Sequence, residues 1–406
     1  MFRPMLAAAI ALLAGPAWAG EGGDIARQHL YAGTLQAGVE ALKPFDERYD
    51  QEGRFGIGLI GFVTAIEHFA QGLYRHGFAS PDVGPMGPAM AMPVPVNPNP
   101  EPLTYDKLRA LLGGLVTDMD AAKVALLSAG EMGDYVVPVD ILKIRVDVDG
   151  DGTAGENESV GAVLMGMFGA GGGSAPPDTT IGFDRADAIW LAGYSQIVAA
   201  QADFLLAHDF HELVEASFHR LFPRAGLPMQ DYTHSTSTLM LDPESDNAIA
   251  DALAAIHTLN FPVVEPQRLK GVLARLHEII SLSRRNWDAI LAETDDNREL
   301  VPSPKQTPLM QDAVVTDATV AAWLATLDTT EQVLNGELLI PHWRFRQGFD
   351  LKAYFENATR TDLVMLITGH DALPFLKDGP IASADSFAEA NAVFGDALWG
   401  YAFWFN

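Results

Sequence analysis

A twelve-residue acidic segment, residues 147–158, constrains the fold of this chain more than any other stretch of its sequence. It reads Asp-Val-Asp-Gly-Asp-Gly-Thr-Ala-Gly-Glu-Asn-Glu, with acids at positions 1, 3, 5 and 12 and glycine at position 6. Carboxylates at alternate positions repel one another unless a hard cation gathers their oxygens, and the glycine allows the sharp turn that this requires. We therefore expect a tight loop around a cation near the middle of the chain.

The spacing Asp-x-Asp-x-Asp-Gly-x5-Glu resembles the calcium-binding loop of the EF-hand family, over these twelve residues alone. The resemblance implies a calcium (Ca2+) site with oxygen ligands from five residues: Asp147, Asp149, Asp151, Thr153 through its backbone carbonyl, and Glu158. A water molecule would fill position 9, because Gly155 has no side chain. The alternative is a solvated acidic turn that binds no ion tightly.

Two features of the segment differ from the usual motif. Position 8 is Ala154, where a branched apolar residue normally pairs with a second loop, and no second loop of this spacing occurs in the chain. A lone loop is more typical of a rigid structural site than of a paired cytosolic sensor. We therefore expect the ion to have a mainly structural role.

The charge balance narrows the range of partners. The chain has 53 acidic and 26 basic residues, a formal net charge of -27. Binding to nucleic acid or to an anionic membrane surface needs clustered Lys and Arg, so neither partner is expected. The absence of cysteine excludes disulfides, thiolate metal sites and a cysteine nucleophile.

The first 19 residues have the pattern of a secretory signal peptide. Arg3 precedes the apolar run of residues 5–14, and Ala17-Trp18-Ala19 forms a small-x-small cleavage site. The apolar run is too short for a permanent membrane span. We predict a periplasmic or secreted protein without stable membrane insertion.

Hydrophobic periodicity predicts a mainly α fold, with helical hairpins or an irregular helical bundle around one EF-hand-like loop. The expected helices are residues 24–43, 54–77, 105–129, 183–222, 246–259, 266–294 and 316–334. The predicted divisions are a signal peptide (1–19), an N-terminal helical hairpin (20–79), a Pro-rich linker (80–103), a helix with the calcium loop (104–170) and a C-terminal helical domain (178–406).

Two segments of short predicted secondary structure flank the loop. Residues 135–146 fit a short entering helix, although their crowded β-branched residues also fit an extended strand. Residues 160–168 fit a short exit helix that ends before a Gly/Pro-rich stretch.

A second set of possible ligands lies near the end of the helix predicted over residues 183–222. Helical spacing would place five imidazole and carboxylate side chains on one face: His208, His211, Glu212, Glu215 and His219. Such groups suit zinc, iron or copper, but the sequence contains no His-Glu-x-x-His and no paired Glu-x-x-His. A solvated or core-edge polar stripe is the alternative.

No catalytic motif is present. The sequence has no phosphate-binding Gly-x-x-x-x-Gly-Lys loop, no dinucleotide-binding motif and no Gly-x-Ser-x-Gly elbow. We therefore name no catalytic residue and no organic cofactor, and the sequence neither shows nor rules out an enzyme. The sequence favours a secreted or periplasmic calcium-binding helical protein. The alternatives are a transition-metal protein or metallohydrolase based on residues 208–219, and a scaffold or binding module of the cell envelope whose protein partner is unknown.

Overall fold

The computed structural model describes residues 20–80, 94–163, 178–232, 236–308, 314–395 and 398–406. The predicted signal peptide, residues 81–93 of the predicted linker and the end of the predicted exit helix lie outside the described residues. Residues 94–103 of the linker contain no helix, as their prolines require.

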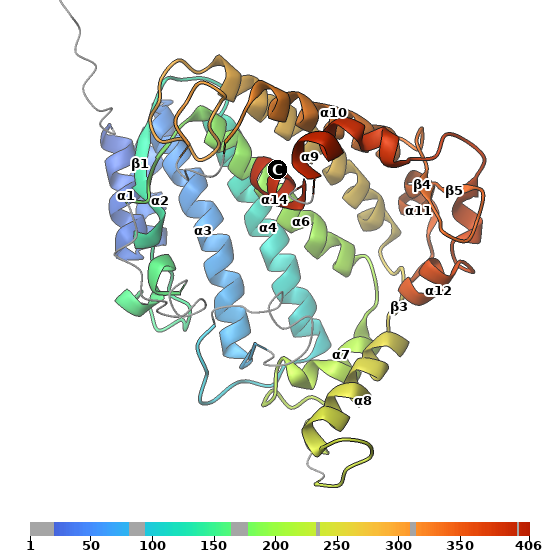
Figure 1. Cartoon of the computed structure of the whole chain (residues 1–406). Coiled ribbons are helices and arrows are strands. Elements are labelled where there is room, and N and C mark those ends of the chain that lie inside the picture. Colours follow the sequence, from blue (N-terminus) through green and yellow to red (C-terminus); the bar gives the residue numbers. More distant parts are fainter. Residues whose placement is uncertain (1–19, 81–93, 164–177, 233–235, 309–313, 396–397) are drawn as a thin grey trace, which may run out of the picture.

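Four long helices lie side by side through the middle of the molecule (Figure 1). They are α3 (Gln51–Arg75), α4 (Tyr105–Ala129), α6 (Arg185–Leu206) and α9 (Pro266–Ala292). Local chemistry fixes three of their starts, because the side chains of Asp50, Thr104 and Asp184 accept backbone N–H groups in the first turns of α3, α4 and α6. The prediction of a mainly α fold is confirmed.

Two short helices cover the outer side of α3. α1 (Glu21–Ala32) and α2 (Leu35–Glu47) replace the single helix that the sequence predicts over residues 24–43. The helix is interrupted at Gly33, which ends α1 in the left-handed conformation with φ of 63°. The prediction of one helix here is wrong because the glycine acts as a terminating cap.

The remaining elements surround this row of helices. The other α-helices are α7 (His211–Ser217), α8 (Pro243–His257), α10 (Asp317–Leu334), α11 (Leu351–Asn357), α12 (Leu363–Thr368), α13 (Ala388–Phe394) and α14 (Leu398–Phe405). The 3-10 helices are η2 (Ile141–Lys143), η3 (Glu156–Glu158), η4 (Phe218–Arg220), η5 (Leu373–Phe375) and η6 (Ala384–Phe387).

The strands are short and all pair antiparallel. β1 (Val137–Asp140) pairs with β2 (Thr180–Phe183), and β3 (Asn260–Pro262) pairs with β6 (Arg360–Asp362). β5 (Gly348–Phe349) lies between β4 (Ile340–Pro341) and β7 (Leu376–Lys377). The entering helix predicted over residues 135–146 is therefore wrong. The strand alternative holds at β1, where the β-branched Val137 and Val139 are buried and alternate with half-buried residues.

The larger hydrophobic core extends from α1 to α14. Its centre holds the rings of Trp287 and Phe405, both fully buried, with their centroids 4.7 Å apart in an edge-to-face arrangement. A smaller core, with Phe78 against Phe222, lies between the ends of α3, α4 and α6 and the region of α7. The division into domains predicted from the sequence stays a prediction.

Among the described residues, α3 is the one helix whose length and composition would allow it to cross a membrane. Its buried side packs against α1, α2, α4 and α6. The core helix of a soluble protein has the same length and composition, so α3 carries no argument for a membrane span.

We predict that the contact between α3 and α4 tolerates no added methyl group at Gly58. A Cβ there would lie 2.7 Å from Leu126 Cγ and 2.9 Å from the Leu126 backbone nitrogen. Gly58→Ala should therefore lower the free energy of unfolding by about 1–3 kcal/mol. Gly114→Ala on α4, where a Cβ meets nothing within 4 Å, should raise it by about 0.5–1 kcal/mol. Urea unfolding measures both, and equal effects of the two changes would contradict the packing argument.

Candidate metal centre

The acidic loop is closed at its base by paired backbone. Arg145 and Ser159 form an antiparallel bridge. The Val146 N–H donates to the Glu158 carbonyl at 3.2 Å, and the Val160 N–H donates to the Ile144 carbonyl at 2.9 Å. Residues 160–163 then begin a helix, as predicted for the exit segment. The loop is therefore entered from extended backbone rather than from a helix, unlike the motif that it resembles.

Asp147 organises the turn through its carboxylate. One oxygen accepts the backbone N–H groups of Gly150 (2.8 Å) and Asp151 (3.2 Å), and the other accepts that of Gly152 (2.9 Å). Gly150 and Gly152 have φ of 73° and 89°, in the region that favours glycine. The first ligand position thus fixes the fold of the loop before any ion is considered.

Two side chains of α3 hold the loop from outside. The Asp147 N–H donates to Glu67 Oε2 at 2.7 Å, and Gln71 Nε2 donates to the Asp147 carbonyl at 2.7 Å. These residues lie one helical turn apart, so they reach the same point of the loop. The sequence gives no signal of either contact, because the partners are 80 and 76 residues apart in the chain.

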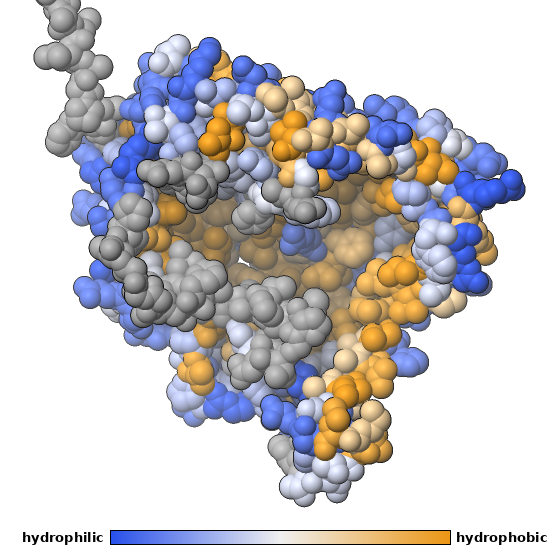
Figure 2. All heavy atoms as spheres, viewed as in Figure 1, coloured by the Kyte–Doolittle hydropathy of each residue, from blue (hydrophilic) through white to orange (hydrophobic). Residues whose placement is uncertain are grey.

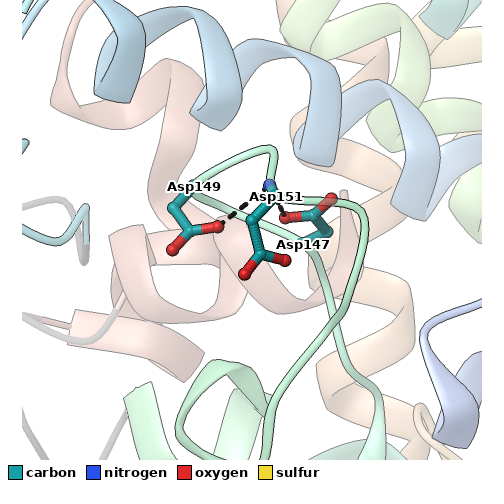
Figure 3. Close-up of side chains that lie close together, drawn as sticks. All are labelled: Asp147, Asp149 and Asp151. Carbon is teal, nitrogen blue, oxygen red and sulfur yellow. Dashed lines mark hydrogen bonds between the residues drawn. The ribbon is translucent and has the colours of Figure 1, made fainter.

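Three of the predicted ligands come together at the mouth of the loop. Asp147, Asp149 and Asp151 each place a carboxylate oxygen within 4.8 Å of those of the other two. Figure 3 shows the three side chains on one turn, with the Asp151 N–H donating to Asp149 (3.1 Å) as well as to Asp147. Asp147 is buried, whereas Asp149 and Asp151 are exposed. Hard carboxylate oxygens at this spacing are the ligands that Ca2+ prefers.

The other two predicted ligands are placed differently. Glu158 is buried and lies outside the group of three; its oxygens accept the N–H groups of Val148 (2.9 Å) and Gly155 (2.8 Å). Thr153 is exposed, and its N–H donates to Asp151 Oδ1 at 2.8 Å. Glu158 thus joins the two halves of the loop.

Four acids of the loop lack a basic partner among the residues that the structure describes. In the described part of the chain, none of Asp147, Asp149, Asp151 and Glu158 forms an ion pair with Lys, Arg or His. Desolvation raises the pKa of Asp149, and the neighbouring carboxylates of Asp151, Glu158 and Asp147 raise it further. Burial also raises the pKa of Glu67, with Asp147 and Glu158 adding to the rise. A divalent cation is the natural counter-charge for such a group.

Ala154, at position 8, faces the break between α1 and α2. It is buried, and a Cβ added to Gly33 would lie only 2.1 Å from Ala154 Cβ. In addition, the Arg145 N–H donates to the Leu30 carbonyl of α1 at 3.0 Å. The α1–α2 turn therefore occupies the side of the loop on which a second EF-hand loop usually pairs. A small residue at position 8 follows from this close approach.

The histidine-rich face predicted on one helix over residues 183–222 is not formed. α6 ends at Leu206, α7 begins at His211, and η4 carries His219. His208 Nε2 lies 2.7 Å from the Thr361 hydroxyl, and His219 Nε2 lies 3.3 Å from Asp251. The prediction fails because His208 bridges to Val263 beside β3, which turns the chain away from the axis of α6.

The other members of that predicted face lie apart from the buried histidines. His211 and Glu215 form an exposed ion pair on α7 at 3.3 Å, and Glu212 is exposed. Within the described residues, the five side chains form no group with their ligand atoms within 4.8 Å of one another.

A second group of acids, which the sequence analysis missed, is buried at the start of α6. Asp184, Asp187 and Glu299 bring carboxylate oxygens within 4.8 Å of one another, and Glu293 at the end of α9 interacts with Asp184. Asp184 is recognisable in the sequence as a helix cap. Only tertiary packing brings Asp184 close to residues 293–299.

No protein-family model matches this chain, and no curated protein sequence or solved structure is significantly similar to it. The geometry of the loop and its motif therefore remain the guide to function.

We predict that enlarging position 8 separates the loop from the helices. Ala154→Ile restores the residue type usual in the motif, but the added atoms would collide with Gly33 and lower the free energy of unfolding by about 1–3 kcal/mol. Val124→Ile, at an exposed position on α4, is the matched control and should change it by less than about 0.5 kcal/mol. Thermal melts compare the two, and an unchanged melting temperature in Ala154→Ile would show that the turn does not confine position 8.

Proposed function

We propose that this chain is a secreted or periplasmic calcium-binding helical protein in which Ca2+ stabilises the contact between the acidic loop and the helices α1 and α3. The observation that carries the proposal is the meeting of Asp147, Asp149 and Asp151 within 4.8 Å, without a basic partner in the described residues. The EF-hand spacing of the same residues supports Ca2+ over other hard cations.

In this proposal the ion would be held by the three aspartates, the Thr153 carbonyl and Glu158. It would supply positive charge where the loop has none of its own. The chain's part is to hold the first aspartate in place: its N–H and carbonyl are bound by Glu67 and Gln71, and its carboxylate is fixed by three backbone N–H groups. Such pre-organisation favours binding because little of the site has to be ordered by the ion.

The same contacts account for a structural role. The loop contacts α1 through Leu30 and Gly33, and α3 through Glu67 and Gln71. An ion that binds only the folded loop adds its binding free energy to the stability of these contacts. Extracellular calcium sites typically have Kd values of about 10⁻⁴–10⁻³ M. A site of this class would therefore stay occupied by Ca2+ outside the cytosol.

We predict that Ca2+ raises the melting temperature of the chelator-treated protein, and that Asp147→Asn removes this effect. At a Ca2+ concentration 100 times Kd, the gain is about 2.7 kcal/mol. The substitution keeps the size of the side chain but removes the charge at the most buried of the three aspartates. Asp288→Asn, at an exposed acid of α9 that forms no ion pair with the described residues, controls for net charge and should respond to Ca2+ as the wild type does.

Calorimetric titration of the same three proteins provides an independent measurement. One binding event in wild type and in Asp288→Asn, and none in Asp147→Asn, is the expected result. No heat and no bound ion at millimolar Ca2+ in the wild type would contradict the proposal.

A second candidate function, a protein-binding module of the cell envelope, is favoured by an exposed apolar strip. Figure 2 shows apolar surface running over α8 and up to α12 along one side of the molecule. The apolar strip consists of Leu239, Met240, Leu241, Ile249, Leu253, Ile256, Val264, Leu363, Val364 and Ile367. Apolar patches of this kind mark interaction surfaces more often than isolated exposed residues do.

Hydrogen bonds fix the backbone of residues 239–241, at one end of the strip. The Asp246 carboxylate accepts the N–H groups of Leu239 (2.6 Å), Met240 (3.0 Å) and Leu241 (3.1 Å). The same hydrogen bonds lower the pKa of Asp246, so it is charged over a wide pH range. The three apolar side chains are thus kept 64–86% exposed by a fixed backbone.

We predict that a photoreactive residue placed at position 253 of the strip forms a defined adduct with another protein in the producing cells. Position 124 on α4 is the control, because Val124 is 66% exposed and lies outside the strip. Adducts identified by mass spectrometry should appear at position 253 only. Equal capture at both positions would show that the strip has no preferred partner.

A further inference from the structure

The buried acids at the start of α6 form a group of four, which we call the carboxyl latch: Asp184, Asp187, Glu293 and Glu299. Asp184, Asp187 and Glu299 are 8%, 5% and 3% exposed, and Glu293 is partly buried. The first two belong to the start of α6, while the last two belong to the end of α9 and the irregular segment after it. The group therefore joins two parts of the chain that are distant in sequence.

Within the described residues, the hydrogen bonds donated to the latch come from neutral amides. Asp184 accepts from the Ala186 N–H (2.7 Å), and Asp187 accepts from the Asp184 N–H (3.0 Å). Glu299 accepts from the Asn297 N–H (2.9 Å), and Glu293 accepts from the Gln306 side chain (3.0 Å). No ion pair with Lys, Arg or His involves any of the four in the described residues. Four ionised carboxylates in such a place would repel one another strongly.

The charged groups around the latch do not offset the repulsion between its carboxylates. On α6, Arg185 lies between the two aspartates in sequence but pairs with neither, and Arg298 pairs with Asp178. The other facing groups are acidic or neutral at pH 7: Asp134, Tyr135, Asp295, Asp296 and, beyond Tyr135, Glu52. The surroundings therefore favour protons on the latch.

The two carboxyl groups of Asp184 and Glu293 also favour a proton on one of them. Burial raises the pKa of Glu293, and the charge of Asp184 raises it further. A pocket of about 260 Å³, lined by both residues and by Gly133, Tyr135 and Asp295, lies against the pair. It gives solvent a route for proton exchange.

We propose that the carboxyl latch holds residues 293–299 on the start of α6 while it is protonated, and that its ionisation at alkaline pH releases this segment. The segment is closely fitted in the closed state. The Gly182 N–H of β2 donates to the Arg298 carbonyl at 3.3 Å, and a Cβ at Gly182 would lie 2.3 Å from the Asn297 carbonyl oxygen. The Trp404 indole of α14 donates to the Leu300 carbonyl at 2.9 Å. Release would therefore loosen β2 and α14 together.

The direction of the pH dependence follows from the pKa values. Burial raises the pKa of Glu293 to about 9, with the charge of Asp184 adding to the rise, and burial raises that of Glu299 to about 7. Burial raises the pKa of Asp187 well above its usual value. Groups whose pKa is higher in the folded state stabilise it fully below their unfolded pKa, near 4.5 for glutamate. This contribution is lost as the pH rises through about 7 and then about 9.

The test compares the pH dependence of stability in wild type and in Glu293→Gln, since the amide keeps a donor for Asp184 but carries no charge at any pH. The folding equilibrium constant should fall between pH 5 and pH 9.5 in the wild type. In Glu293→Gln the fall should be at least about tenfold smaller, which corresponds to one pKa unit. Glu299→Gln is the second variant, should the first not fold, and Asp288→Asn is the exposed control that should behave like the wild type. Equal falls in the wild type and the latch variants would overturn the proposal.

Hydrogen exchange locates the change. Residues 293–300 and 180–183 should lose protection at pH 9 in the wild type and keep it in Glu293→Gln. A divalent cation is the rival occupant, so the melts are repeated with Ca2+ and with chelator in an Asp147→Asn background, in which the acidic loop is disabled. If Ca2+ restores alkaline stability there, the latch is a cation site and the proton proposal is overturned. If Ca2+ has no effect there, the proton proposal stands, whether or not the loop binds calcium.

Discussion

Repulsion between acids that have no basic partner in the described part of the chain is the constraint on which this structure depends. Two carboxylates with oxygens 4.8 Å apart repel by about 3 kcal/mol at an effective dielectric constant of 20. The structure concentrates such groups in two places, the acidic loop beside α3 and the carboxyl latch at the start of α6. Both places connect elements that are distant in sequence. The integrity of the helical row therefore depends on how each charge is compensated.

The two places differ in the compensation that their surroundings favour. The loop has exposed carboxylates at Asp149 and Asp151, which an ion can reach from solvent with little rearrangement. The latch is mostly buried, and three of its members bring carboxylate oxygens within 4.8 Å of one another. Hydrated cations enter buried sites at a high desolvation cost, whereas a proton needs no coordination shell. We therefore propose a cation for the acidic loop and protons for the carboxyl latch.

The helices could be predicted where local signals fix them. α4 and α10 begin at their predicted positions because Thr104 and Thr316 cap them, and α9 begins at Pro266, where proline is favoured in the first turn. The prediction over residues 183–222 failed because no glycine or proline marks the end of α6. The Asp209 N–H instead donates to the Pro262 carbonyl at 2.8 Å, a contact that no local pattern indicates.

The acidic residues of the candidate site could be predicted from the sequence. The residues that support the loop could not. The spacing within residues 147–158 is local, so the meeting of the three aspartates follows from sequence. Glu67, Gln71 and Gly33 reach the loop through tertiary packing, and their residue types alone do not distinguish them from an ordinary helix surface or turn. The carboxyl latch escaped prediction for the same reason.

The contact between the loop and α3 influences the stage of folding at which the site forms. Asp147 and Glu67 lie 80 residues apart, so their contact belongs to the long-range pairings whose loop-closure entropy makes them slow to form. Interactions that are absent from the folding transition state act on the rate of unfolding rather than on the rate of folding. An ion bound here after the folding transition state would therefore lengthen the lifetime of the native protein and leave the rate of folding nearly unchanged.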